Sequence, residues 1–164
     1  MRIKLFTNTV PKTVANFKKL CEPGATPAKS VHDTAKDKHY VGSKFFRIWK
    51  GFFLHGGDYI YNTGKGNEGA DGMVFRDENF LIKHDQKYLL SMVTRGRHTN
   101  GSQFLITLDK LPMLDDLQVV FGMIHPDDVA KIDTLEAEGT TASTGTPAND
   151  VTITHCQELE PALT

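Results

Sequence analysis

Short apolar runs separated by turn-rich stretches are the feature that most constrains the fold of this chain. Runs of four to seven residues, rich in aromatic and β-branched side chains and bounded by glycine, proline or polar clusters, are typical of β-strands. We predict strands over residues 2–6, 45–49, 88–94, 104–107, 119–124 and 151–155. Many short strands joined by turn-rich links favour a mainly β fold, here a β-barrel plugged by helices.

Two segments between these runs show helical spacing instead. The first begins at Pro11, because proline is tolerated in the first turn of a helix. Its apolar face carries Val14, Phe17, Leu20 and Cys21. The second begins at Pro126 and Asp127, and Gly139 can end it. Its buried face carries Val129, Ile132 and Leu135.

The length and charge of the chain narrow the class of protein. A chain of 164 residues suits one domain, which we expect to span residues 1–164. The formal net charge of -1 gives no electrostatic case for nucleic acid or an anionic membrane as a partner. No apolar run approaches the roughly 20 residues of a membrane helix, and residues 1–6 lack the longer apolar core of a signal peptide.

The two cysteines, Cys21 and Cys156, lie far apart in the sequence and show no CxxC spacing. They could pair with each other, but we expect two free thiols, as in a reducing compartment. The expected location is therefore the cytoplasm, with the nucleus as the alternative.

Three short motifs are too incomplete to define a chemistry. A GxGxxG pattern at residues 64–69 is not followed by a helix, which argues against dinucleotide binding. Ser91 and Ser102 lack the GxSxG frame of a serine hydrolase. His55 and Asp58 could face a metal together, but no third ligand stands out, so we interpret them as a pocket-edge histidine and a turn aspartate. We expect neither a cofactor nor a metal.

Arg47 lies inside the aromatic run at residues 45–49. Strand alternation would place Arg47 on one face with Phe45 and Trp49, and Phe46 and Ile48 on the other. A guanidinium on a partly apolar surface is costly unless it is paired or used. The residues alone leave two interpretations open: the side chain extends into solvent from the sheet exterior, or it belongs to a binding site.

Taken together, the motifs resemble the cyclophilins, a family of peptidyl-prolyl cis-trans isomerases. The resemblance covers nearly the whole chain, in order and at similar spacing. It rests on residues 10–17, on the F-x-R-I-x-x-G-F-x-x-x-G-G-D block at 45–58, on residues 77–84, 90–92, 99–104 and 119–122, and on Ile153, Cys156 and Leu159. It implies a closed antiparallel β-barrel of eight strands capped by two α-helices, with a shallow proline pocket on its outer face.

The resemblance also assigns site residues. Arg47 matches the family's catalytic arginine, and Gln103 matches a glutamine that hydrogen-bonds the substrate backbone. Phe52 and Leu114 match apolar pocket residues. Other pocket positions depart from the family's usual residues: Phe53, His55, Thr94, Arg95, Leu105, Met113 and Gln118. His55 stands where a glutamine usually helps to hold the arginine, and Met113 where a tryptophan contributes to cyclosporin binding.

These departures leave three functional hypotheses. The first is an active isomerase that binds proline-containing peptides and proteins, assists their folding, and binds cyclosporin A with reduced affinity. The second is a catalytically weak or inactive Xaa-Pro-binding module, a scaffold in a protein assembly. The third is an interaction domain that uses the loop at residues 22–43.

Two structural departures accompany them. The chain begins where the family's second strand would lie, so the first family strand is missing, and an open barrel edge would accept another strand or aggregate. The loop at residues 22–38 is longer than in minimal members of the family. It lacks periodicity, so we expect it to be exposed and a candidate partner surface.

Overall fold

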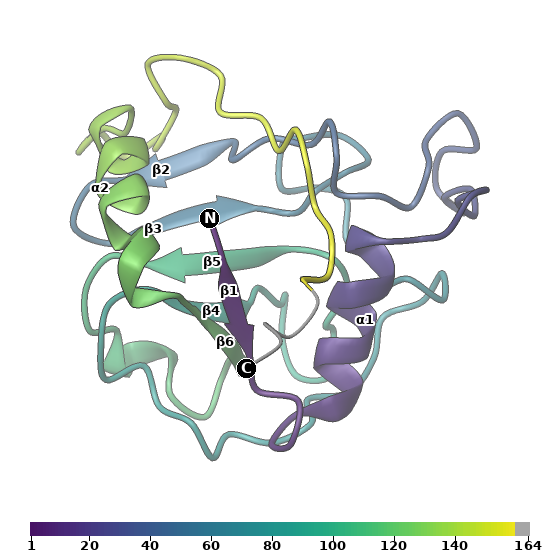
Figure 1. Ribbon diagram of the computed structural model, residues 1–164, viewed down its shortest axis with the longest axis horizontal. Helices are drawn as coiled ribbons and strands as arrows, with labels where there is room; N and C mark the ends of the chain where they lie inside the picture. The colour runs from purple at the N-terminus through teal and green to yellow at the C-terminus, as the bar shows by residue number, and fades with distance from the viewer. Residues whose placement is uncertain (160–164) are drawn as a thin grey trace.

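The computed structural model of the protein describes residues 1–159 and contains a six-stranded antiparallel sheet in the order β1-β6-β4-β5-β3-β2 (Figure 1). The strands are β1 (Ile3–Leu5), β2 (Arg47–Trp49), β3 (Phe53–Gly56), β4 (Leu89–Met92), β5 (Phe104–Thr107) and β6 (Val120–Ile124). The mainly β fold predicted from the short apolar runs is confirmed.

One face of the sheet builds the core. A row of cross-strand neighbours runs over β2, β3, β5 and β4: Ile48, Leu54, Ile106 and Leu90. None of these four residues is more than 1% exposed. Because facing residues of antiparallel strands project to the same side of a sheet, the row forms a continuous apolar wall.

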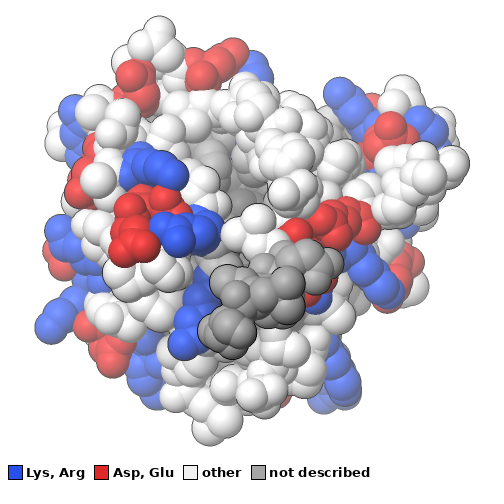
Figure 2. Space-filling view, in the orientation of Figure 1, with Lys and Arg blue, Asp and Glu red and all other residues white. Residues whose placement is uncertain are grey.

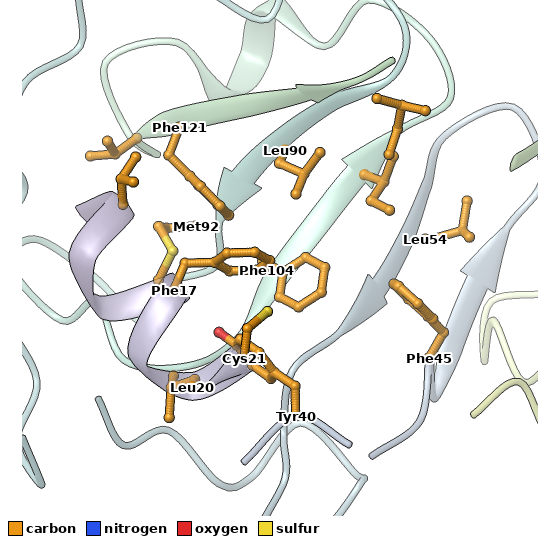
Figure 3. Packing of buried hydrophobic residues seen from close by; sticks show 14 of the residues in the cluster. Phe17, Leu20, Cys21, Tyr40, Phe45, Leu54, Leu90, Met92, Phe104 and Phe121 are labelled. Carbon is orange, nitrogen blue, oxygen red and sulfur yellow. The ribbon is translucent and has the colours of Figure 1, made fainter. Parts of the chain in front are cut away.

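Helix α1 (Pro11–Cys21) packs on this core through Phe17. The Phe17 ring centroid lies 5.1–5.4 Å from the ring centroids of Tyr40, Phe104 and Phe121 (Figure 3). The Glu78 carboxylate accepts hydrogen bonds from the backbone N–H groups of Lys12 and Thr13 at 3.0 and 2.8 Å. These are first-turn groups that no carbonyl of the helix can reach. The predicted start at Pro11 and the predicted apolar face are confirmed.

The second predicted helix is also present and lies at the opposite side of the sheet from α1 in Figure 1. A 3-10 turn, η2 (Pro126–Asp128), leads into α2 (Val129–Ala137). Ile132 is fully buried, while Val129 and Leu135 are partly buried against the core. Gly139 follows the helix, and a Cβ atom there would lie 2.5 Å from Ile48 Cγ2, so the close approach of α2 to β2 requires glycine.

Two details of the strand prediction are wrong. Residues 151–155 form no strand and pair only through an isolated bridge between Lys44 and Thr152, because the facing segment, residues 42–45, is irregular. The run at 45–49 is regular only over β2. Phe45 and Ile48 both point into the core, whereas strict alternation placed Phe45 with Arg47.

The sheet does not close into the expected barrel. Arg2, Lys4 and Phe6 pair with β6, so the backbone groups of Ile3 and Leu5 point away from it. In residues 1–159, no strand pairs with this outer edge of β1. Residues 151 and 153 likewise form backbone hydrogen bonds to residues 42–45, which leaves the backbone groups of residues 152 and 154 facing the other way.

A hollow of about 1000 Å³ lies between these two open edges, and Figure 2 shows the surface sunken there. Its rim includes β1 and residues 151–157. Its floor consists of core side chains: Phe17, Tyr40, Phe45, Phe104 and Ile106. These five floor side chains are at most 5% exposed, so the hollow lies over the core without exposing it.

The loop at residues 22–43 is anchored rather than freely exposed. Lys38 Nζ and Glu68 Oε1 form an ion pair at 3.1 Å, with side chains 8% and 0% exposed. Glu68 also accepts hydrogen bonds from Ser30 Oγ at 2.6 Å and from the Val31 N–H at 3.1 Å. Burial alone would raise the pKa of Glu68, but these hydrogen bonds and Lys38 lower it overall. Apart from the buried Ser30 and Lys38, most of the segment 22–38 keeps the predicted exposure, at residues 24–26, 28–29, 31–32 and 34–37 among others.

The prediction of two free thiols is wrong. Cys21 and Cys156 form a disulfide that joins the end of α1 to the C-terminal segment, with Cα atoms 5.0 Å apart. Disulfides persist in oxidising environments, so the argument from free thiols to a reducing compartment no longer holds. Over residues 1–159, the longest helices are too short and too polar to cross a membrane.

Candidate active site

The outer face of the sheet brings together side chains from three strands. Arg47 on β2 lies opposite His55 on β3, and His55 lies opposite Leu105 on β5. Facing residues project to the same side, so these three side chains form one line, which we call the Arg47 row. The alternate positions Ile48 and Leu54 point into the core, which places the Arg47 row on the outer face.

Arg47 is half-buried and retains its hydrogen-bonding capacity. Its guanidinium carbon lies 5.5 Å from the centroid of the Trp49 ring, a distance at which the ring face attracts a cation. Within residues 1–159 Arg47 forms no ion pair. The five N–H donors of its guanidinium are therefore available to a ligand.

Three half-buried aromatic rings lie beside Arg47, and we call them the aromatic ledge: Trp49, Phe52 and Phe53. The Trp49 centroid lies 5.9 Å from that of Phe52 and 5.2 Å from that of Phe53, and the two phenylalanine rings are 4.7 Å apart. A hollow of about 310 Å³ lies between the ledge and residues 140–143, but Arg47 does not line it. Trp49 and Phe52 line this hollow, whereas Phe53, like Arg47, does not.

His55 and Gln103 are joined through their side chains, with 2.8 Å between His55 Nε2 and Gln103 Oε1. The amide nitrogen of Gln103 donates to the carbonyls of Gly64 at 3.0 Å and Gly66 at 2.5 Å. Because both N–H groups of the amide face acceptors, its oxygen faces the imidazole, and His55 must donate from Nε2. Nδ1 of His55 then carries the free lone pair.

Burial keeps His55 neutral. The residue is 6% exposed. Desolvation lowers the pKa of His55 to about 4 and outweighs the Gln103 hydrogen bond, which raises it; the charge of Arg47 adds a smaller lowering. At physiological pH the ring is therefore an uncharged acceptor at Nδ1, on the strand position facing Arg47.

Asp58 fixes the loop that holds Gln103. Its fully buried carboxylate accepts five backbone hydrogen bonds at 2.9–3.2 Å, from Ile60, Tyr61, Thr63, Gly64 and Gly66. A Cβ atom on Gly66 would lie 2.3 Å from Asp58 Oδ1, so the loop requires glycine there. Asp58 is the turn aspartate expected from the sequence. Across residues 1–159, no cluster of three or more His, Cys, Asp or Glu side chains is arranged to hold a metal.

Arg95 reaches the same loop from the segment after β4. One of its terminal nitrogens donates to the carbonyls of Gly64 and Lys65, both at 2.7 Å. Gly64 therefore links Arg95 to Gln103 and, through Gln103, to the Arg47 row. The sequence places Thr94 and Arg95 among the pocket positions that depart from the family but does not reveal this side-chain contact, because its partners lie some thirty residues away. Thr94 itself is half-buried.

At the other end of the row, His84 joins β4 to the 3-10 turn η1 (Pro112–Leu114). His84 Nε2 lies 2.8 Å from Ser91 Oγ, and His84 Nδ1 lies 3.0 Å from Asp115 Oδ1. Ser91 faces Leu105 and so continues the Arg47 row. Ser91 and His84 are both fully buried, which leaves this Ser-His-Asp arrangement inaccessible to a substrate. Its role is to hold η1 against the sheet.

The turn η1 carries two of the expected pocket residues. Met113 is 57% exposed and Leu114 is half-buried. The Gln118 N–H donates to the Leu114 carbonyl at 3.1 Å, and Gln118 Oε1 is buried with no hydrogen-bond partner among residues 1–159. These three residues border the far end of the row without a side-chain hydrogen bond to Arg47, His55 or Gln103.

Fold and sequence together define the class of this protein. The chain belongs to the family described as cyclophilin type peptidyl-prolyl cis-trans isomerase/CLD, whose pattern matches residues 1–158. It is 41% identical over 163 residues to the NK-tumor recognition protein of Mus musculus, covering 98% of this chain and 11% of that protein. It is also 41% identical over 158 residues to the NK-tumor recognition protein of Homo sapiens, covering 95% of this chain and 10% of that protein. The chain thus spans about a tenth of the length of these curated relatives.

Proposed function

We propose that this chain is a peptidyl-prolyl cis-trans isomerase that binds Xaa-Pro segments on the Arg47 row and assists protein folding. The observation that carries the proposal is Arg47 itself, a half-buried guanidinium with no ion pair to any of residues 1–159, beside the aromatic ledge. Rotation about a peptide bond faces a barrier of about 18–20 kcal/mol, while cis and trans Xaa-Pro differ by only about 0.5–1 kcal/mol. A catalyst therefore has to stabilise only the twisted state.

Arg47 can supply that stabilisation. In the twisted state, the lone pair of the prolyl nitrogen is no longer delocalised, so the nitrogen becomes a hydrogen-bond acceptor. A guanidinium N–H can donate to it then, and not in the planar ground state, so the interaction lowers the barrier. A hydrogen bond to a charged group contributes about 1.5–3 kcal/mol. This corresponds to an acceleration of about ten- to a hundredfold.

His55 and Gln103 act through Arg47 in this proposal. Nδ1 of the neutral His55 can accept an N–H from Arg47 and turn the guanidinium away from Trp49, toward the substrate. Gln103 fixes the imidazole through Oε1, while its amide N–H groups are occupied by Gly64 and Gly66. Gln103 is therefore a positioning residue whose contact with a substrate backbone is limited to the remaining lone pair of Oε1.

Apolar side chains hold the prolyl ring and remove water from the planar, polar amide. The residues proposed for this role are Phe52, Phe53, Met113 and Leu114, with the buried Leu105 beneath them as the floor and with Thr94 and Gln118 at the polar rim. Met113 is largely exposed and flexible, so it offers a ligand less fixed surface than a rigid ring. Cyclosporin A is therefore expected to bind, but weakly.

Exchange spectroscopy on a short Ala-Pro peptide tests this function. The wild type should accelerate cis–trans exchange, and Arg47→Ala should remove most of the acceleration while the peptide still binds. Lys50→Ala is the matched control, because Lys50 is an exposed cation three positions away. Identical exchange rates with and without the wild-type protein would refute the proposal.

One observation favours a second function, a catalytically weak Xaa-Pro-binding module. The Arg47 guanidinium lies against the Trp49 ring, and if it stays there when a peptide is bound it cannot reach the prolyl nitrogen. Peptide binding seen as chemical-shift changes, without exchange broadening of the cis and trans signals, would select this alternative.

A further inference from the structure

Arg95 lies where a peptide bound on the Arg47 row would continue. Gly64 accepts hydrogen bonds from both Gln103 at 3.0 Å and Arg95 at 2.7 Å. Three successive hydrogen bonds thus lead from His55, on the row, to the guanidinium of Arg95. An extended peptide advances about 3.3 Å per residue, so a side chain one to three positions from the proline can reach Arg95.

The guanidinium of Arg95 is held in place without being neutralised. A single terminal nitrogen contacts the two carbonyls, of Gly64 and Lys65, which carry no net charge. The other N–H groups keep the planar fork that matches a carboxylate or a phosphate. The loop beneath is fixed by Asp58, so ordering of Arg95 adds little to the entropic cost of binding.

The exposed charge around Arg95 is positive. Arg95, its contact Lys65 and its neighbour Arg97 are all exposed, and none forms an ion pair within residues 1–159. We call these three residues the basic rim. The acidic side chains nearby do not offset it at the surface. Asp58 is fully buried, and Asp77 is 2% exposed and held by His98.

We propose that Arg95 determines substrate specificity by selecting an anionic side chain, carboxylate or phosphate, one to three residues from the proline. This inference rests on the proposed function for the place of the proline and adds the class of substrate. Exposed charge pairs are individually weak, so a glutamate peptide should be favoured over its glutamine counterpart about two- to fivefold at low salt. Phosphoserine, with nearly two charges at neutral pH, should be favoured more.

The test is a set of Ala-Pro peptides with glutamate, glutamine, lysine or phosphoserine placed two or three residues before the proline, or one, two or three residues after it. For each peptide, the dissociation constant is measured by NMR titration and kcat/KM by exchange spectroscopy. At one of these positions, the wild type should prefer glutamate to glutamine, and the preference should shrink as salt is raised, because salt screens exposed charges. A wild type with no glutamate preference at any position would overturn the proposal.

Variants separate charge recognition from a merely structural role. Arg95→Gln should abolish the preference by weakening binding of the glutamate peptide more than binding of the glutamine peptide, and Arg95→Glu should invert it in favour of lysine. Lys87→Gln, at an exposed lysine just before β4, should change nothing. Arg95→Lys should keep part of the preference, since it keeps the charge. Equal losses of all peptides in Arg95→Gln and Arg95→Lys would show that Arg95 only supports the loop.

The measured dissociation constants allow the specificity proposal and the isomerase proposal to fail independently of each other. If no peptide is accelerated but the glutamate peptide binds more tightly than the glutamine peptide in an Arg95-dependent way, the isomerase proposal fails and the specificity proposal stands. If all peptides are accelerated equally, the isomerase proposal stands and the specificity proposal fails.

Discussion

His55 donates its Nε2 proton to Oε1 of Gln103 across 2.8 Å, and this contact links the Arg47 row to the glycine-rich loop. The two residues are 48 positions apart in the sequence. The orientation of the amide follows from the two carbonyls on its nitrogen, and the tautomer of the imidazole follows from the amide. A substitution at either residue should therefore change the position of the Arg47 side chain.

The pKa of His55 predicts acid sensitivity. Its value of about 4 in the folded protein lies below its ordinary value, so the unfolded chain takes up a proton first as the pH falls. The contribution of a neutral His55 is therefore complete above about pH 7 and is lost between about pH 6.5 and 4, with a total of about 3 kcal/mol. Urea unfolding of wild type and His55→Gln across this range should show a shallower pH dependence in the variant. The pH dependence that remains in His55→Gln includes a contribution from His84, whose pKa is also lowered by burial.

Removing the Gln103 side chain should slow catalysis through Arg47. Gln103→Ala leaves His55 Nε2 without its acceptor, and loss of one hydrogen bond costs about 0.5–1.5 kcal/mol, or about two- to tenfold in kcat/KM. The expected loss is in kcat more than in KM, and NMR titration of His55 should report a changed pKa. A kcat equal to that of the wild type would contradict a positioning role.

The buried ion pair predicts a large asymmetry between two lysines of the same loop. Lys38→Met strands Glu68 as an uncompensated buried charge, which should cost about 3–5 kcal/mol of the free energy of unfolding. Lys29→Met is the matched control, because its partner Asp37 is exposed and such pairs contribute at most about 1 kcal/mol. Denaturant unfolding measures both, and adding Glu68→Gln to Lys38→Met should restore part of the loss. Equal effects at Lys38 and Lys29 would disagree with the burial described here.

Reduction of the disulfide should destabilise the protein. The bond between Cys21 and Cys156 closes a loop with a sequence separation of 135, and cross-links of this kind typically contribute about 2–4 kcal/mol. The Cys21→Ser/Cys156→Ser double variant and the reduced wild type should show the same lowered urea midpoint. A midpoint unaffected by reductant would mean that the two thiols are not paired in solution.

The sequence predicts the elements whose signal is local. Helix α1 and helix α2 follow from proline at the start and apolar residues three or four apart, and five of the six strands follow from short β-branched and aromatic runs. Strand β3 lies outside the predicted strands because the glycines on either side of it break the apolar run. Residues 151–155 have the composition of a strand but lack a regular partner, and pairing is a property that one segment alone does not specify.

In the candidate site, too, some features follow from the sequence and others depend on contacts between distant segments. Family resemblance locates Arg47, His55 and Gln103, and strand register then explains why they share one face. The contact of Arg95 with Gly64 depends on how a distant loop folds around Asp58. The buried pair of Lys38 and Glu68 likewise joins two loops without periodicity. Such contacts between distant irregular segments leave no spacing that a pattern in the sequence would reveal.

The gap between β1 and residues 151–157 has a practical consequence for handling this protein. Environment-sensitive dyes report unfolding because a native protein normally offers them little apolar surface, whereas here the half-buried side chains of Ile3, Leu5, Val151 and Ile153 line an open hollow. The native protein should bind such a dye and fluoresce before any heating. A dye-based melting curve would then begin from a high baseline and understate the transition, so circular dichroism or calorimetry is the sounder readout of its thermal stability.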